Sequence, residues 1–211
     1  MIKLPVGVEI NSLIDDLRIF SWEASEILLY YSQILKDSNN KSNIIKNDNL
    51  EDPVTIADLN VNKTIIQRIN EKYKHICWEI LSEENVKIAS NTFDIKANWL
   101  WVLDPLDGTK DFLQGTGQYA VHLGLVHNNQ PVLGVVLLPE LEELWLGVVG
   151  VGAWCEDIKG NRSSVMFSQR RKLRDLIIVS SRNHRDLRLE KLIGKLDLGG
   201  TKSIGSVGWS S

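Results

Sequence analysis

The spacing of hydrophobic residues changes along this chain of 211 residues, and that change limits the folds it can adopt. Residues 12–35 and 58–73 carry apolar side chains at intervals of three and four, which predicts two amphipathic helices. In the middle of the chain the interval falls to two, which predicts strands, two of them joined by a turn at Asn128 and Asn129. Helical spacing returns at 183–196. This order predicts an α+β fold of packed layers.

The predicted elements divide into two lobes. We expect an N-terminal lobe of helices and sheet over residues 1–127 and a partial C-terminal α/β lobe over residues 128–211. Within the first lobe, short apolar runs predict one strand that ends at Leu81 and another at 99–103. The polar, Asn-rich segment 36–52 is expected to be a mobile loop between the first two helices.

Composition places the chain among ordinary globular proteins. Hydrophobic residues make up 43% of the chain and charged residues 24%, and the net charge is −3. A nucleic-acid polymer is not expected as a partner, because its recognition would need a basic excess or stripe. The one basic cluster fits a solvated face. Its members are Arg170, Arg171, Lys172 and Arg174.

The sequence also favours a cytoplasmic protein without membrane contact. The N-terminus lacks a basic region followed by an apolar run, so no signal peptide is expected. The longest apolar stretch, 144–154, contains three glycines and is too short to span a bilayer. Cys77 and Cys155 lie far apart in apolar surroundings without metal-ligand spacing, so we expect both to be reduced core residues.

The densest group of polar residues directly follows the second predicted strand. Asp104 and Asp107 lie on either side of Pro105, whose ring fixes φ and so restricts the turn. Both carboxylates and the Leu106 carbonyl could then face one cation. Mg²⁺ prefers hard oxygen ligands of this kind, so the motif is a candidate metal site.

The residues after these acids are suited to bind an anion. Gly108 and Thr109 would begin a short helix, and free N–H groups at a helix start favour a phosphate oxygen. The alternative is an ordinary Asp-Pro turn whose acids only cap that helix. Taken alone, the motif fits both interpretations.

Two further acidic segments favour the metal-binding interpretation. Glu83 and Glu84 follow the strand that ends at Leu81, and Asp58 stands where the second helix begins. Taken singly, the glutamates fit a surface position and Asp58 fits an ordinary first-turn acid. Acids gathered at the ends of separate elements are costly to desolvate and usually pair with cations.

These segments together resemble the inositol-monophosphatase superfamily. An acid and Phe after DPLDGTK is most similar to the 3′(2′),5′-bisphosphate nucleotidases of sulfur assimilation, whereas the inositol-specific branch more often has Asn after the Thr. The resemblance implies a layered αβαβα sandwich of the sugar-phosphatase type. The likeness covers nearly all of the chain, with PVT-x-AD at 53–58, SEE at 82–84, DPLDGTKDF at 104–112, GVVLLP at 134–139, GAW at 152–154 and SRNH at 181–184.

The resemblance also implies roles for individual residues. Asp58 and Thr109 would be a catalytic pair, in which Asp58 accepts a hydrogen bond from Thr109 and the pair helps to deprotonate a metal-bound water. For His184, plain packing at a helix N-terminus fits as well as nucleotide binding, and we take His75, His122 and His127 as structural. The implied metal ligands are Glu83, Asp104, the Leu106 carbonyl and Asp107. The implied substrate-binding residues are Glu83, Leu106, Asp107, Gly108, Thr109, Ser181 and His184.

The implied activity is that of a Mg²⁺-dependent phosphomonoesterase. Such an enzyme would remove the 3′-phosphate of adenosine 3′,5′-bisphosphate, giving AMP and phosphate. Two or three Mg²⁺ ions would neutralise the ester and lower the pKa of bound water, and Li⁺ is an expected inhibitor. The partner is a small phosphorylated substrate, and a homodimer is compatible with the family. Alternatives are an inositol monophosphatase or other small phosphomonoesterase, or an inactive remnant that binds metal or a partner subunit.

One expectation concerns the end of the sequence. Superfamily members carry a Trp-Asp motif beyond a GS-x-G stretch, and its Asp completes the metal site. The sequence reaches that stretch at 205–208 and ends at Ser211. The resemblance therefore leads us to expect a truncated chain with an incomplete C-terminal lobe, low solubility and little activity by itself.

Overall fold

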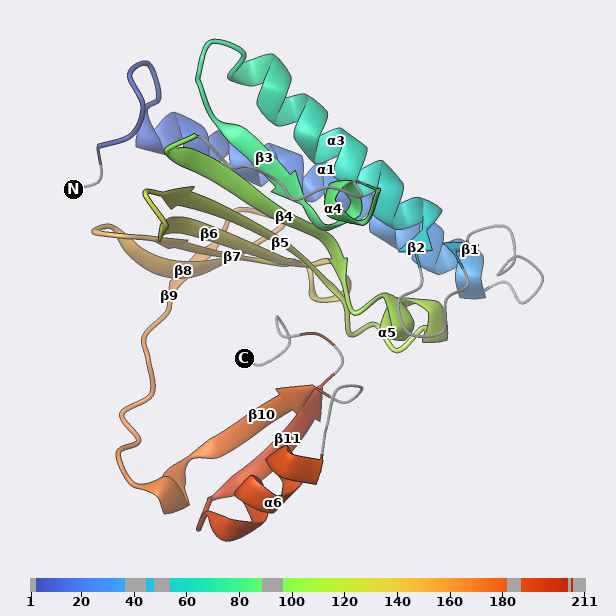
Figure 1. Cartoon of the computed structure of the whole chain (residues 1–211), viewed down its shortest axis with the longest axis vertical. Helices are drawn as coiled ribbons and strands as arrows, with labels where there is room; N and C mark the ends of the chain where they lie inside the picture. Colours follow the sequence, from blue (N-terminus) through green and yellow to red (C-terminus); the bar gives the residue numbers. More distant parts are fainter. Residues whose placement is uncertain are drawn as a thin grey trace.

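The structure is a computed structural model that describes residues 3–36, 45–47, 54–88, 97–181, 187–204 and 206. Two helices form one layer of the fold and lie side by side over one face of the main sheet (Figure 1). These are α1 (Ile10–Lys36) and α3 (Ile56–Lys72), and both confirm the predicted helices to within a few residues. Their apolar stripes, including Leu13, Leu17 and Ile65, are almost fully buried. Each such side chain stabilises the fold by about 1.5–3 kcal/mol.

The N-terminus of α3 is closed by a capping box. The Thr55 side chain accepts hydrogen bonds from the backbone N–H groups of Ala57 and Asp58, and the Asp58 carboxylate accepts from the Thr55 N–H at 2.8 Å. Two of the free donors of the first helical turn are therefore satisfied by the Thr55 side chain. This cap also fixes the position of Asp58 at the start of the helix.

The main sheet has seven strands in the order β3-β4-β5-β6-β7-β8-β9. β3 and β4 are parallel, and each later strand is antiparallel to the one before it. In β5 the residues Val121, Leu123 and Leu125 are buried, whereas His122 and Gly124 are half-buried on the opposite face. The strands are β3 (Glu79–Ser82), β4 (Trp99–Asp107), β5 (Ala120–His127), β6 (Gln130–Leu138), β7 (Glu143–Val148), β8 (Gly152–Asp157) and β9 (Arg162–Ser164).

Short elements connect this framework. The predicted turn between β5 and β6 is confirmed, because Asn128 and Asn129 both have positive φ, at 48° and 62°. Positive φ at both central residues suits a two-residue hairpin loop, and Asn tolerates it. The remaining elements are β1 (Ile45–Asn47) paired with β2 (Val54–Thr55), α4 (Glu83–Ile88), α5 (Thr109–Gln114) and a 3₁₀ turn at Pro139–Leu141.

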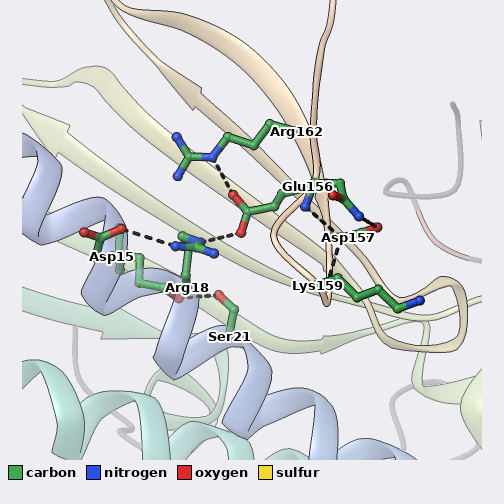
Figure 2. A network of polar contacts seen from close by, with 9 residues as sticks. Asp15, Arg18, Ser21, Glu156, Asp157, Lys159 and Arg162 are labelled. Carbon is green, nitrogen blue, oxygen red and sulfur yellow. Dashed lines mark hydrogen bonds and ion pairs between the residues drawn. The ribbon is translucent and has the colours of Figure 1, made fainter.

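A charged network joins α1 to the far edge of the sheet (Figure 2). The Glu156 side chain on β8 is fully buried and accepts hydrogen bonds from Arg18 of α1 and, at 2.7 Å, from Arg162 of β9. Arg18 also contacts Asp15 at 3.3 Å. The arginines compensate the buried carboxylate, which would otherwise carry a large desolvation cost.

The C-terminal region forms a separate β-α-β unit (Figure 1). Its strands β10 (Ile177–Ser181) and β11 (Gly200–Ile204) are parallel, and α6 (Leu187–Lys195) lies between them in the sequence. An extended segment, 165–172, leads from β9 to a 3₁₀ turn at Leu173–Asp175. Among the described residues, no element of this unit packs extensively against the main sheet.

Several expectations need correction or stay open. β4 does not end before Asp104 but runs on to Asp107, because its pairing with β5 resumes after an irregularity. Both cysteines are free, yet Cys77 is exposed and Cys155 is only half-buried, so neither is a fully buried core residue. The expected loop 36–52 contains β1, and most of its other residues lie outside the described part. The boundary between 127 and 128 stays a prediction, although the β5–β6 hairpin crosses it.

Candidate active site

The acidic residues meet where β3 ends and its pairing with β4 stops. These strands are parallel, and Ser82 pairs with Leu103 in their register. The next residue of each strand is therefore Glu83 on one side and Asp104 on the other. Parallel strands place their carboxyl ends at the same edge of a sheet, so these side chains emerge together.

Electrostatics show that the acids are crowded. The pKa of Asp104 is raised to about 8, first by burial, then by the negative charge of Glu83 and a hydrogen bond with its side chain, and also by Asp107. Two carboxylates can share a hydrogen bond only while one of them carries a proton. A cation at this position would remove the need for that proton.

Backbone geometry next to these acids requires glycine. Gly108 has φ of +85°, and a Cβ atom there would lie 2.8 Å from the Gln118 carbonyl oxygen. Only glycine meets both conditions without strain. Before it, the Leu106 N–H donates to Asp104 Oδ1 at 3.1 Å, which holds the bulged part of β4. The chain can then turn directly into α5.

Thr109 and Asp58 are brought together from distant parts of the sequence. Thr109 Oγ1 lies 3.0 Å from the Leu106 carbonyl oxygen and 3.4 Å from Asp58 Oδ1. The pKa of Asp58 is raised to about 6, chiefly by burial, against hydrogen bonds from Thr55 that lower it. The negative charge of Glu84 raises it further. Asp58 is thus an acceptor that titrates close to neutral pH.

Two residues that the sequence did not assign to the site contact Asp107. Ser206 donates a hydrogen bond from its hydroxyl group to Asp107 Oδ2, although the two residues are 99 positions apart. His122, paired with Asp104 across β4 and β5, has Nε2 3.9 Å from the same oxygen. The pKa of His122 is lowered by burial, which outweighs the opposing effect of Asp107. Strand alternation puts His122 on the less buried face of β5, and this alternation is the sequence feature that could have indicated His122 as a site residue.

The remaining candidates are less well placed. Ser181 ends β10 opposite Ile204 of β11, but its side chain lies outside the described part of the structure. His184 also lies outside the described residues. Their predicted contacts with a nucleotide therefore stay predictions.

The donor set fits a hard divalent cation with additional ligands. Within the ranges that the structure describes, no group of three or more His, Cys, Asp or Glu side chains is placed so that it could hold a metal ion. Mg²⁺ is usually bound by one or two carboxylates together with waters and substrate phosphates. The acids around Asp104 and the Leu106 carbonyl supply oxygen donors of this type.

Fold and site together define an α/β protein with an acidic centre at its strand ends. A family model described as the inositol monophosphatase family matches residues 16–209, and the chain belongs to that family. It is 34% identical over 158 residues to the 3′(2′),5′-bisphosphate nucleotidase CysQ of Salmonella typhimurium, covering 74% of this chain and 60% of the relative. It is 39% identical over 112 residues to CysQ of Aggregatibacter actinomycetemcomitans, covering 52% of this chain and 39% of the relative.

Solved structures agree with this fold. The extragenic suppressor protein suhB of Bartonella henselae superposes with a TM-score of 0.73 at 22% identity, covering 92% of this chain and 71% of the other. An inositol monophosphatase of Thermotoga maritima gives a TM-score of 0.70 at 20% identity, covering 92% and 69%. The layered α+β architecture predicted from the sequence is therefore confirmed. The chain spans 60% of the length of the Salmonella relative.

Proposed function

We propose that this chain is a Mg²⁺-dependent phosphomonoesterase that converts adenosine 3′,5′-bisphosphate to AMP and phosphate. The observation that carries the proposal is the placement of Glu83 beside Asp104 at the end of the β3–β4 pairing, with Asp107 close enough to raise the pKa of Asp104. Acids held this close are stable in ionised form only with a cation among them. Similarity to proteins named bisphosphate nucleotidase supports the choice of substrate.

The proposed ligands are the carboxylates of Glu83, Asp104 and Asp107 and the carbonyl oxygen of Leu106. Two or three Mg²⁺ ions held there would neutralise the phosphate ester and lower the pKa of water. The backbone of Gly108 and Thr109 would hold phosphate oxygens.

Thr109 and Asp58 would handle the proton of the attacking water. The Thr109 hydroxyl, 3.4 Å from Asp58 Oδ1, is placed to pass its proton to that carboxylate while it accepts one from water. The water oxygen would then bond to phosphorus while the bond between phosphorus and the 3′-oxygen breaks, and the leaving 3′-oxygen would take up a proton from solvent to give AMP. A pKa of about 6 keeps Asp58 ionised at pH 7 without making it a negligible base.

The acid that distinguishes the nucleotidase-like motif has a structural position. Asp111 is almost fully buried, and its Oδ1 accepts a hydrogen bond from Thr116 Oγ1 at 2.9 Å. Asp111 therefore shapes the turn after α5. We infer that it influences substrate choice through the loop at 115–118, with Ser181 and His184 as the proposed nucleotide contacts.

Further properties follow from the same proposal. A site of hard oxygen donors would also accept Li⁺, and we expect millimolar Li⁺ to inhibit turnover. A cytoplasmic location and a homodimer remain part of the proposal. Within the described ranges, no helix has both the length and the apolar character needed to cross a membrane.

Phosphate release from adenosine 3′,5′-bisphosphate and from inositol 1-phosphate tests the proposal, with Mg²⁺ or with EDTA. We expect Mg²⁺-dependent hydrolysis of the nucleotide and a loss of at least about 10²-fold in Asp104→Asn, since a ligand is removed. Glu71→Gln, an exposed acid on α3, is the matched control and should keep full activity.

The other outcomes separate the rival functions. Preference for inositol 1-phosphate would support the inositol monophosphatase alternative. A folded protein that binds Mg²⁺ but hydrolyses neither compound would support the non-catalytic alternative. Equal activity of Asp104→Asn and the unmodified chain would overturn the proposed metal site.

A further inference from the structure

The C-terminal β-α-β unit reaches the candidate site through one short segment. β11 ends at Ile204, which is only 3% exposed, and Ser206 is 1% exposed. By contrast, Ile177 and Leu192 of the same unit are 49% and 54% exposed. Ile204 and Ser206 are thus removed from solvent, while Ile177 and Leu192 are open to it.

The buried segment lies directly on the backbone turn that follows the acidic residues. The Ser206 hydroxyl group donates a hydrogen bond to Asp107 Oδ2. A Cβ atom built on Gly108 would lie 3.4 Å from the Ser206 Cβ atom, so Gly108 and Ser206 are in close contact. One residue of the unit therefore touches both a proposed metal ligand and the glycine that allows the turn.

We propose that Ser206 is a positioning residue for Asp107, through which cation binding and docking of the C-terminal unit are coupled. This inference rests on the proposed metal-ligand role of Asp107. His122 Nε2 lies 3.9 Å from the same Oδ2 atom, beyond hydrogen-bond distance, so Ser206 makes the direct contact with this oxygen. Such outer contacts fix the orientation of a ligand, and losing one typically weakens metal binding 10–100-fold.

The coupling follows from thermodynamic reciprocity. If the Ser206 contact orients Asp107 for a cation, then a bound cation must favour the Ser206 contact by the same free energy. Because Ser206 lies two residues after the end of β11, a cation at the site should stabilise the end of that strand. Docking of the unit would then respond to Mg²⁺ with no direct metal contact from its helix or strands.

Hydrogen–deuterium exchange of the full chain, with and without Mg²⁺, tests the coupling. We expect Mg²⁺ to slow exchange both at 104–109 and at 200–204. In Ser206→Ala the effect at 200–204 should disappear, and the Kd for Mg²⁺ from calorimetry should rise about 10-fold. Ser203→Ala, which removes an exposed hydroxyl from the same strand, should behave as the unmodified chain. In an Asp107→Ala background, Ser206→Ala should change Mg²⁺ binding no further.

The result also separates this inference from the proposed function. No Mg²⁺ binding and no change at 104–109 would refute the proposed function and the coupling with it. Binding with protection at 104–109 but no change at 200–204 would overturn the coupling alone. Faster exchange at 200–204 with Mg²⁺ would show that Ser206 competes with the cation for Asp107. The measurement on the unmodified chain remains decisive should Ser206→Ala fold poorly.

Discussion

The main body and the C-terminal β-α-β unit are held together by different forces. In the main body, α1 and α3 cover the sheet, and the core residues there are almost completely removed from water. Among the described residues of the C-terminal unit from 177 onward, the only buried apolar side chain is Ile204, and Val179 on β10 is 37% exposed. The interactions described for this unit include the pairing of β10 with β11, the hydrogen bond from the Gly199 N–H to the Leu176 carbonyl at 2.9 Å, and the contact of Ser206 with Asp107. Apolar burial thus dominates the first region, whereas the described contacts of the second are mainly polar.

The largest expected effect tests this difference directly. Trp101 on β4 is fully buried and packs edge-on against Trp78 at 5.5 Å. Trp101→Ala should lower the free energy of unfolding by about 3–5 kcal/mol, because it leaves a large cavity. Ile177→Ala, at a position 49% exposed in the C-terminal unit, should cost less than about 1 kcal/mol. Urea denaturation followed by circular dichroism measures both, and equal costs would contradict the comparison.

A somewhat smaller effect is expected at the charged network of Figure 2. Arg18→Met should cost about 3 kcal/mol, because it leaves the fully buried Glu156 with one arginine fewer. Asp15→Asn alters the same network at a side chain that is 64% exposed, and should cost under about 1 kcal/mol. Thermal unfolding of the two variants checks the difference. If they unfold alike, the network contributes little to holding α1 on the sheet.

The site between the two regions should respond in rate more than in stability. Thr109→Ala removes the hydroxyl that joins Leu106 and Asp58, and kcat should fall about 10²-fold with a smaller change in KM. Ser163→Ala, which removes an exposed hydroxyl on β9, is the control for loss of a hydroxyl away from the site. Steady-state kinetics on adenosine 3′,5′-bisphosphate measures both, and an unchanged kcat in Thr109→Ala would exclude Thr109 from the mechanism.

The smallest expected effect is a pH dependence from Asp58. Its pKa is raised from 3.8 to about 6 in the folded state, so between these pH values the folded protein keeps a proton on Asp58 that the unfolded chain loses. Stability from this group is therefore greatest below about pH 4 and is lost as pH rises to 6, by roughly 1 kcal/mol per pH unit. The stability of Asp58→Asn should lack this slope.

Denaturation in the presence of EDTA, at pH values from 4 to 7, measures the difference in free energy of unfolding between the unmodified chain and Asp58→Asn. Activity should change in the opposite direction, because protonated Asp58 cannot accept a proton from Thr109. A stability difference that does not change with pH would show that the Asp58 pKa is close to its ordinary value.

The sequence predicted the elements well wherever periodicity was strong. Both long helices follow from apolar spacing, and the hairpin at Asn128 and Asn129 follows from turn chemistry. The end of β4 was predicted wrongly, because Pro105 suggested a break while a bulge lets the strand continue to Asp107. A local motif does not reveal whether a neighbouring strand resumes its pairing.

The candidate site could be predicted only in part. Acids in recognisable motifs, such as Asp104 and Asp58, could be named from the sequence because their spacing is distinctive. His122 and Ser206 could not, since their contacts with Asp107 depend on strand register and on docking of a remote segment. Cys77 was assigned to the core because its neighbours in sequence are apolar, yet it is exposed.

The order of strands in the main sheet also bears on how the chain folds. From β4 to β9 each strand pairs with the next one in sequence, so this part of the sheet can form by closing short loops. The site instead needs Thr109 to meet Asp58 across 51 residues and Ser206 to meet Asp107 across 99. Long loops close at a greater entropic cost and form more slowly. We therefore expect the main sheet to form before the long-range contacts of the site. Substitutions at Asn128 should slow folding, and those at Ser206 should mainly accelerate unfolding.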